Sequence, residues 1–180
     1  MNSSDNKDEI SLIEACIKGD NKAQKKLYDK HAPVMYAICL RYMTNEDEAK
    51  DALQEGFIKA YGNLSKFRFS GSFEGWLKRI FVNASIELIR KRKVHFDVDD
   101  MIPSINQAAY IQTGSMDAEK MMELVQTLPQ GYRTVFNMYV VDGFSHKEIS
   151  EELNISESTS KTQLFKARKQ LQELLKGWFE

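Results

Sequence analysis

The chain has 180 residues, with 42% hydrophobic and 28% charged side chains and only three prolines. This composition excludes collagen-like and largely disordered chains, favours helices, and allows one ordinary domain or two small ones. No apolar run approaches the roughly 20 residues that cross a bilayer, and no signal peptide stands at the start, so we expect a cytoplasmic protein without membrane insertion. The net charge of −1 conceals 8 basic and 2 acidic groups in residues 61–95, followed by 1 and 6 in residues 96–129.

Apolar residues spaced by three and four predict two helices in the first part of the chain. The first runs through residues 23–42, with Asp20 as its N-cap. The second carries an apolar stripe over residues 49–60, and Thr44 with Asp47 predicts a capping box at its start. Its opposite side is acidic and has no basic neighbour in this interpretation, which makes it a candidate contact surface.

A third helix follows Ser72, with an apolar stripe from Trp76 to Leu88. Before it, the segment NLSKFRFSGS is too rich in glycine and serine for a helix, and its two phenylalanines alternate with basic residues. Arg79, Asn83 and Arg90 lie along one stripe of the third helix, away from its apolar face. Cations attract phosphates and aromatic rings stack on unpaired bases, so loop and helix together suggest a surface for single-stranded DNA. Alternatively, the phenylalanines are core residues and the charges line a solvated face.

The helical periodicity fades after this block and returns about 20 residues later. We predict an all-α chain with a domain over residues 1–95, a linker over residues 96–114 containing the acidic DVDD, and a second domain over residues 115–180.

The most specific pattern lies near the C-terminus. Ser145 and Glu148 predict a capping box that starts a short helix, and Asn154 suits a helix stop with positive φ. Ile155 then anchors a tight turn, and Ser156 caps a longer basic helix. Short helix, turn and longer helix make a helix-turn-helix, whose second helix enters the DNA major groove. A helical hairpin with a basic surface is the plain alternative.

Cysteines and histidines give no sign of a metal site or a disulfide. Cys16 and Cys39 stand alone, with no Cys-x-x-Cys spacing, and we expect both in the core. His31, His95 and His146 are widely separated and are predicted at the surface or half-buried. We therefore expect no metal and no cofactor.

Two long stretches carry a family resemblance. The segment DEAKDALQEGFIKAYGNLSKFRFSGSFEGWLKRIFVNASIELIRKRK resembles the second conserved region of the extracytoplasmic-function (ECF) sigma factors. The segment LPQGYRTVFNMYVVDGFSHKEISEELNISESTSKTQLFKARKQL resembles their fourth region. The resemblance implies a non-enzymatic initiation factor of two helical domains, which binds RNA polymerase core, melts the minus-ten element and recognises the minus-thirty-five element. It also implies contacts mainly with the β′ subunit, with β near the second domain, and an anti-sigma partner.

The resemblance assigns roles to particular positions. The acidic core-binding helix of the family matches Asp47, Glu48, Asp51, Gln54, Glu55 and Phe57. Its minus-ten surface matches Asn63, Lys66, Phe67, Arg68, Ser70, Gly71, Arg79, Asn83 and Arg90. Its minus-thirty-five surface matches Ser158, Thr159, Lys161, Thr162, Gln163, Lys166 and Arg168. The chain departs from the family pattern at Gly56, where an aliphatic residue is common, and at Ser160 and Gln163, which replace an apolar anchor and a basic DNA contact.

Two other classes of protein share single features with this sequence. Small helical nucleotide pyrophosphatases hold magnesium with carboxylates at the spacing of Glu48, Asp51 and Glu55. That chemistry needs a second acidic cluster facing the first, and the available glutamates, residues 148–152, fall inside the helix-turn-helix. A regulator with a helical receiver domain would lack the aromatic loop and basic helix of residues 63–93.

Overall fold

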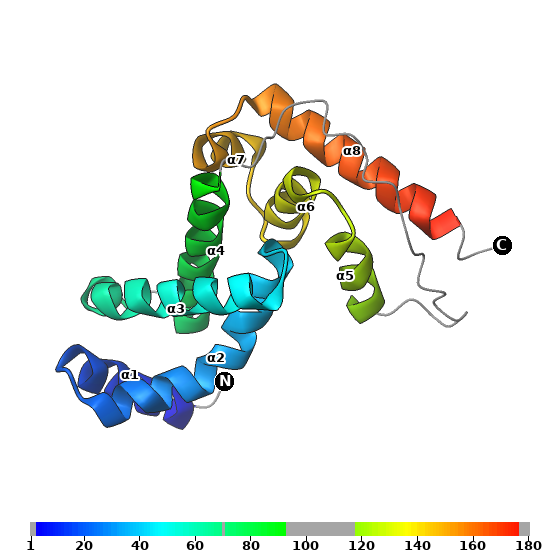
Figure 1. Cartoon of the computed structure of the whole chain (residues 1–180). Coiled ribbons are helices and arrows are strands. Elements are labelled where there is room, and N and C mark those ends of the chain that lie inside the picture. Colours follow the sequence, from blue (N-terminus) through cyan, green and yellow to red (C-terminus); the bar gives the residue numbers. More distant parts are fainter. Residues whose placement is uncertain (1–2, 70, 93–117, 177–180) are drawn as a thin grey trace. The chain divides into compact units, whose positions relative to one another are not determined.

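The computed structural model describes residues 3–69, 71–92 and 118–176 (Figure 1). All regular structure in these ranges is helical, so the all-α prediction is confirmed. The first helices are α1 (Ser3–Ile17), α2 (Asn21–Tyr42), α3 (Glu46–Asn63), the short 3₁₀ helix η1 (Leu64–Lys66) and α4 (Phe73–Lys91). The later ones are α5 (Ala118–Gln126), α6 (Gln130–Phe136), the π-helical turn η2 (Asn137–Val141), α7 (His146–Leu153) and α8 (Glu157–Lys176).

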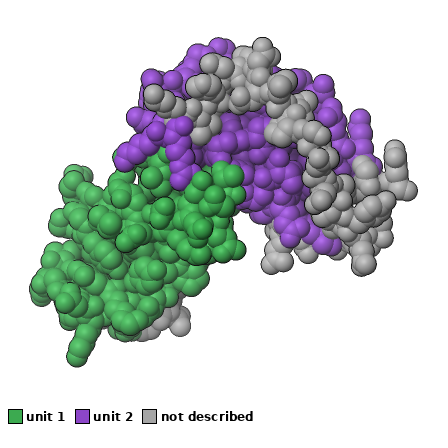
Figure 2. All heavy atoms as spheres, in the orientation of Figure 1, with its two compact units in different colours: residues 1–88 green, residues 89–180 purple. Residues whose placement is uncertain are grey.

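The chain divides into two compact units, residues 1–88 and residues 89–180 (Figure 2). The division falls within the last turn of α4. The predicted domain limits of 1–95 and 115–180 stay predictions, because the linker expected between them lies outside the described residues.

The first unit is built around aromatic and aliphatic side chains of α2, α3 and α4. Phe57 of α3 meets Phe81 of α4 edge to face, with ring centroids 5.0 Å apart. Gly56 lies beside them, and a Cβ on Gly56 would stand 2.4 Å from the Phe81 ring. Real Cβ atoms do not approach a neighbour so closely, so the absence of a side chain at Gly56 is what lets α4 pack against α3.

Helix caps follow the sequence with one shift. Asp20 caps α2 as predicted, since its side chain accepts hydrogen bonds from two backbone N–H groups of the first turn. The predicted pair of Thr44 and Asp47 at the start of α3 is wrong by one residue. Asn45 is the N-cap and accepts from the backbone N–H of Glu48 at 2.9 Å, and the Glu48 carboxylate accepts from the backbone N–H of Thr44 at 3.0 Å. Asparagine is among the strongest N-cap residues, which explains the shift.

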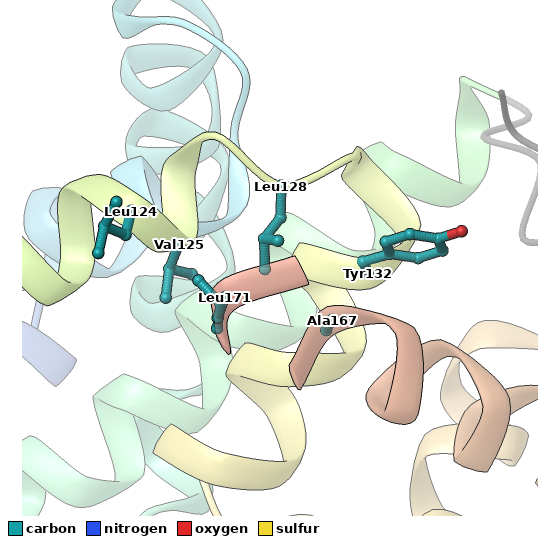
Figure 3. Close-up of a cluster of buried hydrophobic side chains, with 6 residues drawn as sticks. All are labelled: Leu124, Val125, Leu128, Tyr132, Ala167 and Leu171. Carbon is teal, nitrogen blue, oxygen red and sulfur yellow. The ribbon is translucent and has the colours of Figure 1, made fainter. Parts of the chain in front are cut away.

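The second unit has a core where α5, α6 and α8 meet (Figure 3). Each of these helices contributes apolar side chains from one face. The buried cluster consists of Leu124, Val125, Leu128, Tyr132, Ala167 and Leu171. It anchors the middle of α8 and leaves the first turns of that helix to pack on α7.

Both cysteines are buried and free, as predicted. Burial raises the pKa of the Cys39 thiol to about 11, so it is an inert core residue. His31 is buried, contrary to the prediction, and its ring stands edge to face with that of Phe73, with centroids 5.5 Å apart. His146 is half-buried, and His95 lies outside the described residues. No described helix is long and apolar enough to cross a membrane.

Candidate nucleic-acid and polymerase interfaces

The acidic side of α3 is exposed at most of the predicted positions. Asp47, Asp51 and Gln54 are exposed, and Glu48 and Glu55 are half-buried. Three acidic residues stand in the first turn, where the positive end of the helix dipole stabilises their negative charges. The sequence pattern thus placed these five polar side chains on the outside correctly.

Phe57 is the exception on this helix, because it belongs to the core. Its side chain is only 4% exposed, and its ring lies 4.5 Å from Tyr28 and 5.0 Å from Phe81. It shares the apolar stripe of α3 with Ala49 and Ala60. The prediction that Phe57 forms part of a contact surface is therefore wrong, and its role is to hold α3 against its neighbours.

The acidic side of α3 also has basic neighbours, contrary to the prediction. Lys50 Nζ lies 3.4 Å from Asp47 and 3.8 Å from Glu46. Lys59 lies 3.6 Å from Glu55 on the same helix. Surface ion pairs of this kind contribute little to stability, so a binding partner can replace them at small cost.

Asp51 and Gln54 differ from these paired residues. Neither makes a hydrogen bond or ion pair within the described part of the chain. They are the polar groups of α3 that stand ready for a partner without first breaking a bond.

The aromatic loop before α4 turns one phenylalanine inward and the other outward. Phe67 is 8% exposed, with its ring 5.2 Å from Phe73 and 5.4 Å from Trp76. The prediction of Phe67 as a lead residue for capturing a base is therefore wrong, since its ring is occupied by the core. Phe69 is 43% exposed and rests edge to face on Phe67 at 5.0 Å.

Phe69 also has an unusual backbone conformation, with φ of +55°. A bulky residue with positive φ is an outlier, and such strain is concentrated at functional sites. Gly71 follows with φ of +101°, a conformation that suits glycine and lets the chain turn closely there. The sequence suggested base stacking for both phenylalanines of the loop, and Phe69 is the one whose ring is exposed for it.

The remaining polar residues of this surface are placed as follows. Lys66 and Arg68 are exposed, and Ser70 lies outside the described residues. Asn63 is half-buried, with its side chain donating a hydrogen bond to the Lys59 carbonyl at 2.8 Å. That bond closes the end of α3, so Asn63 has a structural task of its own.

Along α4 the three predicted DNA-facing residues are all exposed. Arg79 and Asn83 are one turn apart, and Arg90 stands two turns further along the same side. Trp76 is half-buried and stacks on Phe73 at 5.6 Å, which agrees with its prediction as the anchor of this helix. Arg79, Asn83 and Arg90 thus form an exposed basic strip along α4.

The helix-turn-helix forms as the sequence predicts. Ser145 and Glu148 make both bonds of the capping box, at 3.2 and 2.8 Å. Asn154 ends α7 with φ of +56°, and the Ser156 hydroxyl accepts from the backbone N–H of Thr159 at 3.0 Å. These local bonds fix the angle at which α8 leaves the turn.

On α8, six of the seven predicted DNA residues reach the surface. Ser158, Lys161 and Arg168 are exposed, and Thr159, Thr162 and Lys166 are half-buried. Gln163 is only 2% exposed, so its prediction as a base-reading side chain is wrong. It lies on the buried stripe of α8 with Ser160, Leu164, Ala167 and Leu171. The helical period puts position 163 on that stripe, whatever its polarity.

Comparison with known proteins shows the family to which this chain belongs. Residues 27–94 match the sigma-70 region 2 family and residues 118–171 match the sigma-70 region 4 family. The ECF RNA polymerase sigma factor SigW of Bacillus subtilis (strain 168) is 34% identical over 172 residues, covering 88% of this chain and 92% of the relative. The chain belongs to the ECF sigma factor family. SigM of the same organism is 31% identical over 153 residues, covering 83% of this chain and 93% of the relative.

A solved structure supports the helical fold of this sigma factor. The sigma factor RpoE, in complex with the anti-sigma factor NepR from Bartonella quintana, matches with a TM-score of 0.50 and 24% identity. The match covers 84% of this chain and 96% of that one.

Membership in the family settles the class of function. The protein is a transcription initiation factor of RNA polymerase and not an enzyme. Its region 2 binds the minus-ten promoter element and its region 4 binds the minus-thirty-five element.

Proposed function

We propose that three surfaces of this ECF sigma factor divide the work of initiation. The outer side of α3 binds polymerase core through the β′ subunit. The loop from Asn63 to Ser72 and the basic strip of α4 hold the opened minus-ten strand. Helix α8 reads the minus-thirty-five duplex, with the β subunit near its domain. The observation that carries this division is the exposed Phe69 ring, which follows the exposed cation Arg68 in the chain. A ring and a cation suit unstacked bases and their phosphates, whereas α8 carries the shorter polar groups that suit base edges. Run-off transcription with polymerase core on a promoter library tests the whole proposal.

The polymerase surface can be tested through Asp51. Replacing Asp51 with Lys puts a cation where an acidic, unpaired group faces solvent, so complementary contact with core becomes repulsive. We expect weaker core binding, with the loss greatest at low salt. Glu14→Lys is the matched control, since Glu14 is an exposed carboxylate on α1. Equal core affinity of the two variants in a titration removes α3 from the interface.

The minus-ten surface can be tested through Phe69. Unstacking one base-pair step costs about 1.4 kcal/mol, and one base held on an aromatic face returns about 1–3 kcal/mol. Phe69→Ala holoenzyme should therefore bind promoter but open it roughly 5- to 100-fold less, as followed by a fluorescent base analogue within the minus-ten element. The matched control is Ile17→Ala, an apolar side chain on α1 that is 45% exposed. Full opening by the Phe69 variant contradicts the proposal.

The minus-thirty-five surface can be tested through Thr162. A side chain that contacts a base edge sets preference at one position, worth about 1–3 kcal/mol if a good contact is lost. Thr162→Ala should change the selected sequence at one or two positions of the minus-thirty-five element in a library selection, and Lys176→Ala should leave it unchanged. An unaltered selected sequence would mean that another face of α8 meets the bases.

An anti-sigma factor completes the proposed set of partners. The solved relative RpoE is in complex with an anti-sigma factor. We infer that this chain has such a partner. Affinity purification of the tagged chain from unstressed cells of its source, followed by mass spectrometry, should recover a second protein in stoichiometric amount in addition to polymerase.

A further inference from the structure

Four side chains of the second unit form a continuous column between η2, α7 and α8. The Arg168 guanidinium lies 5.9 Å from the centre of the Tyr139 ring. Tyr139 stacks on His146, with centroids 4.5 Å apart and planes inclined by 24°. At the other end of the column, His146 Nδ1 lies 2.9 Å from the hydroxyl oxygen of Ser160, which also belongs to α8. Both ends of the column are therefore on the DNA-reading helix.

The hydrogen bond between His146 and Ser160 joins the first residue of α7 to the first turn of α8. Ser160 is fully buried, so its hydroxyl requires a partner inside the protein. The residues next to it in the chain, Thr159 and Lys161, are part of the surface proposed to face DNA. A bond that fixes the rotation of this turn also fixes where those side chains point.

The Tyr139–His146 stack contacts Arg168, at the other end of the α8 surface proposed to face DNA. Tyr139 belongs to the π-helical turn η2, a feature that is rare and often marks functional sites. Its ring offers a face to the guanidinium of Arg168, which is exposed and free to point in many directions without that contact. A cation held over a ring loses less freedom when it meets a phosphate.

We propose that His146 and Tyr139 are positioning residues for the minus-thirty-five element. His146 sets the first turn of α8 through Ser160, and Tyr139 sets the direction of Arg168. The inference rests on the assignment of α8 to duplex DNA in the proposed function.

The charges around His146 favour its neutral form. Burial and the nearby Lys161 lower the pKa of His146, Glu157 acts in the opposite direction, and Arg168 lowers it further. A neutral ring with its hydrogen on Nε2 accepts the Ser160 hydroxyl at Nδ1. A protonated ring carries a hydrogen on Nδ1 as well, and it then donates to the Ser160 oxygen, so the two side chains stay hydrogen-bonded in either protonation state.

The test uses holoenzyme and two promoters that differ only in the minus-thirty-five element, so that the ratio of their affinities measures specific recognition. His146→Phe keeps a ring on Tyr139 but removes Nδ1, and should lower this ratio roughly 5- to 30-fold. His146→Asn restores a polar group at the position of Nδ1, and should keep most of the ratio.

Further variants separate positioning from general damage. Ser160→Ala should lower the ratio as His146→Phe does, and the double variant should lose no more than either alone. Tyr139→Leu should weaken binding to both promoters alike, with no added loss when Arg168 is already Ala.

Two results would overturn the inference. In the first, Lys161→Ala and Arg168→Ala weaken promoter binding but His146→Phe and Ser160→Ala leave the ratio unchanged. In the second, Arg168→Ala weakens promoter binding but Tyr139→Leu leaves binding to both promoters unchanged. If Lys161→Ala and Arg168→Ala themselves have no effect, it is the assignment of α8 that fails.

Discussion

Among the glycines that the structure describes, Gly56 is the one at which an added Cβ would meet its neighbours most closely. Its missing Cβ leaves room for the Phe81 ring at 2.4 Å from the position a Cβ would take, and Phe81 is fully buried and cannot swing away. Gly56→Ala should lower the free energy of unfolding by about 1–3 kcal/mol through overpacking, despite the better helix propensity of alanine. Urea denaturation followed by circular dichroism measures the change.

Gly62, on the same helix, provides the control. No atom lies within 4 Å of a Cβ added there. Gly62→Ala should therefore leave stability unchanged or raise it by up to about 1 kcal/mol. If Gly56→Ala is as stable as Gly62→Ala, α4 does not approach α3 as closely as described.

His31 makes the first unit sensitive to acid. Burial and the neighbouring Lys30 lower the pKa of His31, while Glu9 and Glu74 act in the opposite direction. Its Nε2 is buried with no hydrogen-bond partner among the described residues. The unfolded chain, with an ordinary histidine pKa of about 6.5, takes up the proton first. Stability is therefore complete above about pH 6.5 and falls as the pH drops through the lower pKa of the folded state.

The variant His31→Gln removes this titration. Between about pH 7.5 and about pH 5, the wild type should lose more stability than His31→Gln, as measured by urea midpoints across that range. Parallel curves for the two proteins would show that the ring stays neutral in both states or is charged in both.

Individual side chains show where sequence reasoning succeeds and where it stops. Lys66, Arg79 and Lys161 were placed at the surface because charge and helical period agree. Phe67 and Gln163 were placed there wrongly, because residue type outweighed position. A phenylalanine in a loop without periodicity can face either way, and only its contacts with Phe73 and Trp76 decide the matter.

At the scale of elements, spacing and caps were sufficient to predict most of the helices. The short helix α7 was predicted from its capping box, which the structure contains in full. The π-helical turn η2 was not predicted, because an i to i+5 bonding pattern leaves the local apolar spacing nearly unchanged. The Tyr139–His146 stack depends on that turn, and for this reason the column behind the DNA-reading helix could not be inferred from spacing.

The cap of α7 can be tested directly. Ser145→Ala removes the acceptor for the Glu148 N–H and half of the capping box, which should cost about 0.5–2 kcal/mol of stability. Ser150 lies in the middle of the same helix, and its hydroxyl donates a hydrogen bond only to the Lys147 carbonyl. Ser150→Ala should therefore be neutral or slightly stabilising. Thermal unfolding of both variants measures the difference. Equal stability would mean that packing on α8, and not the cap, determines where α7 begins.

At the scale of the whole molecule, the net charge of −1 is the sum of two basic DNA surfaces and acidic remainders. The net charge of the whole chain therefore argues against DNA binding, and the basic surfaces show only when charges are counted segment by segment. The two basic surfaces are also proposed to meet different forms of DNA. The strip of α4 meets a single strand, and α8 meets a duplex. Single strands and duplexes differ in the density of condensed counterions, so the two surfaces should differ in their dependence on salt.

Each lost phosphate contact should lower the slope of log affinity against log salt by about 0.9 on duplex DNA and about 0.7 on a single strand. Lys161→Ala holoenzyme should therefore show a slope smaller by about 0.9 on a fully duplex promoter and on one with a pre-melted minus-ten bubble. Arg79→Ala should lower the slope by about 0.7 on the pre-melted promoter and leave it unchanged on a closed duplex complex. Lys176→Ala, in the last turn of α8, controls for a general loss of positive charge. If Arg79→Ala lowers the slope equally on both promoters, α4 contacts the duplex, and the assignment of its basic strip to the opened strand is wrong.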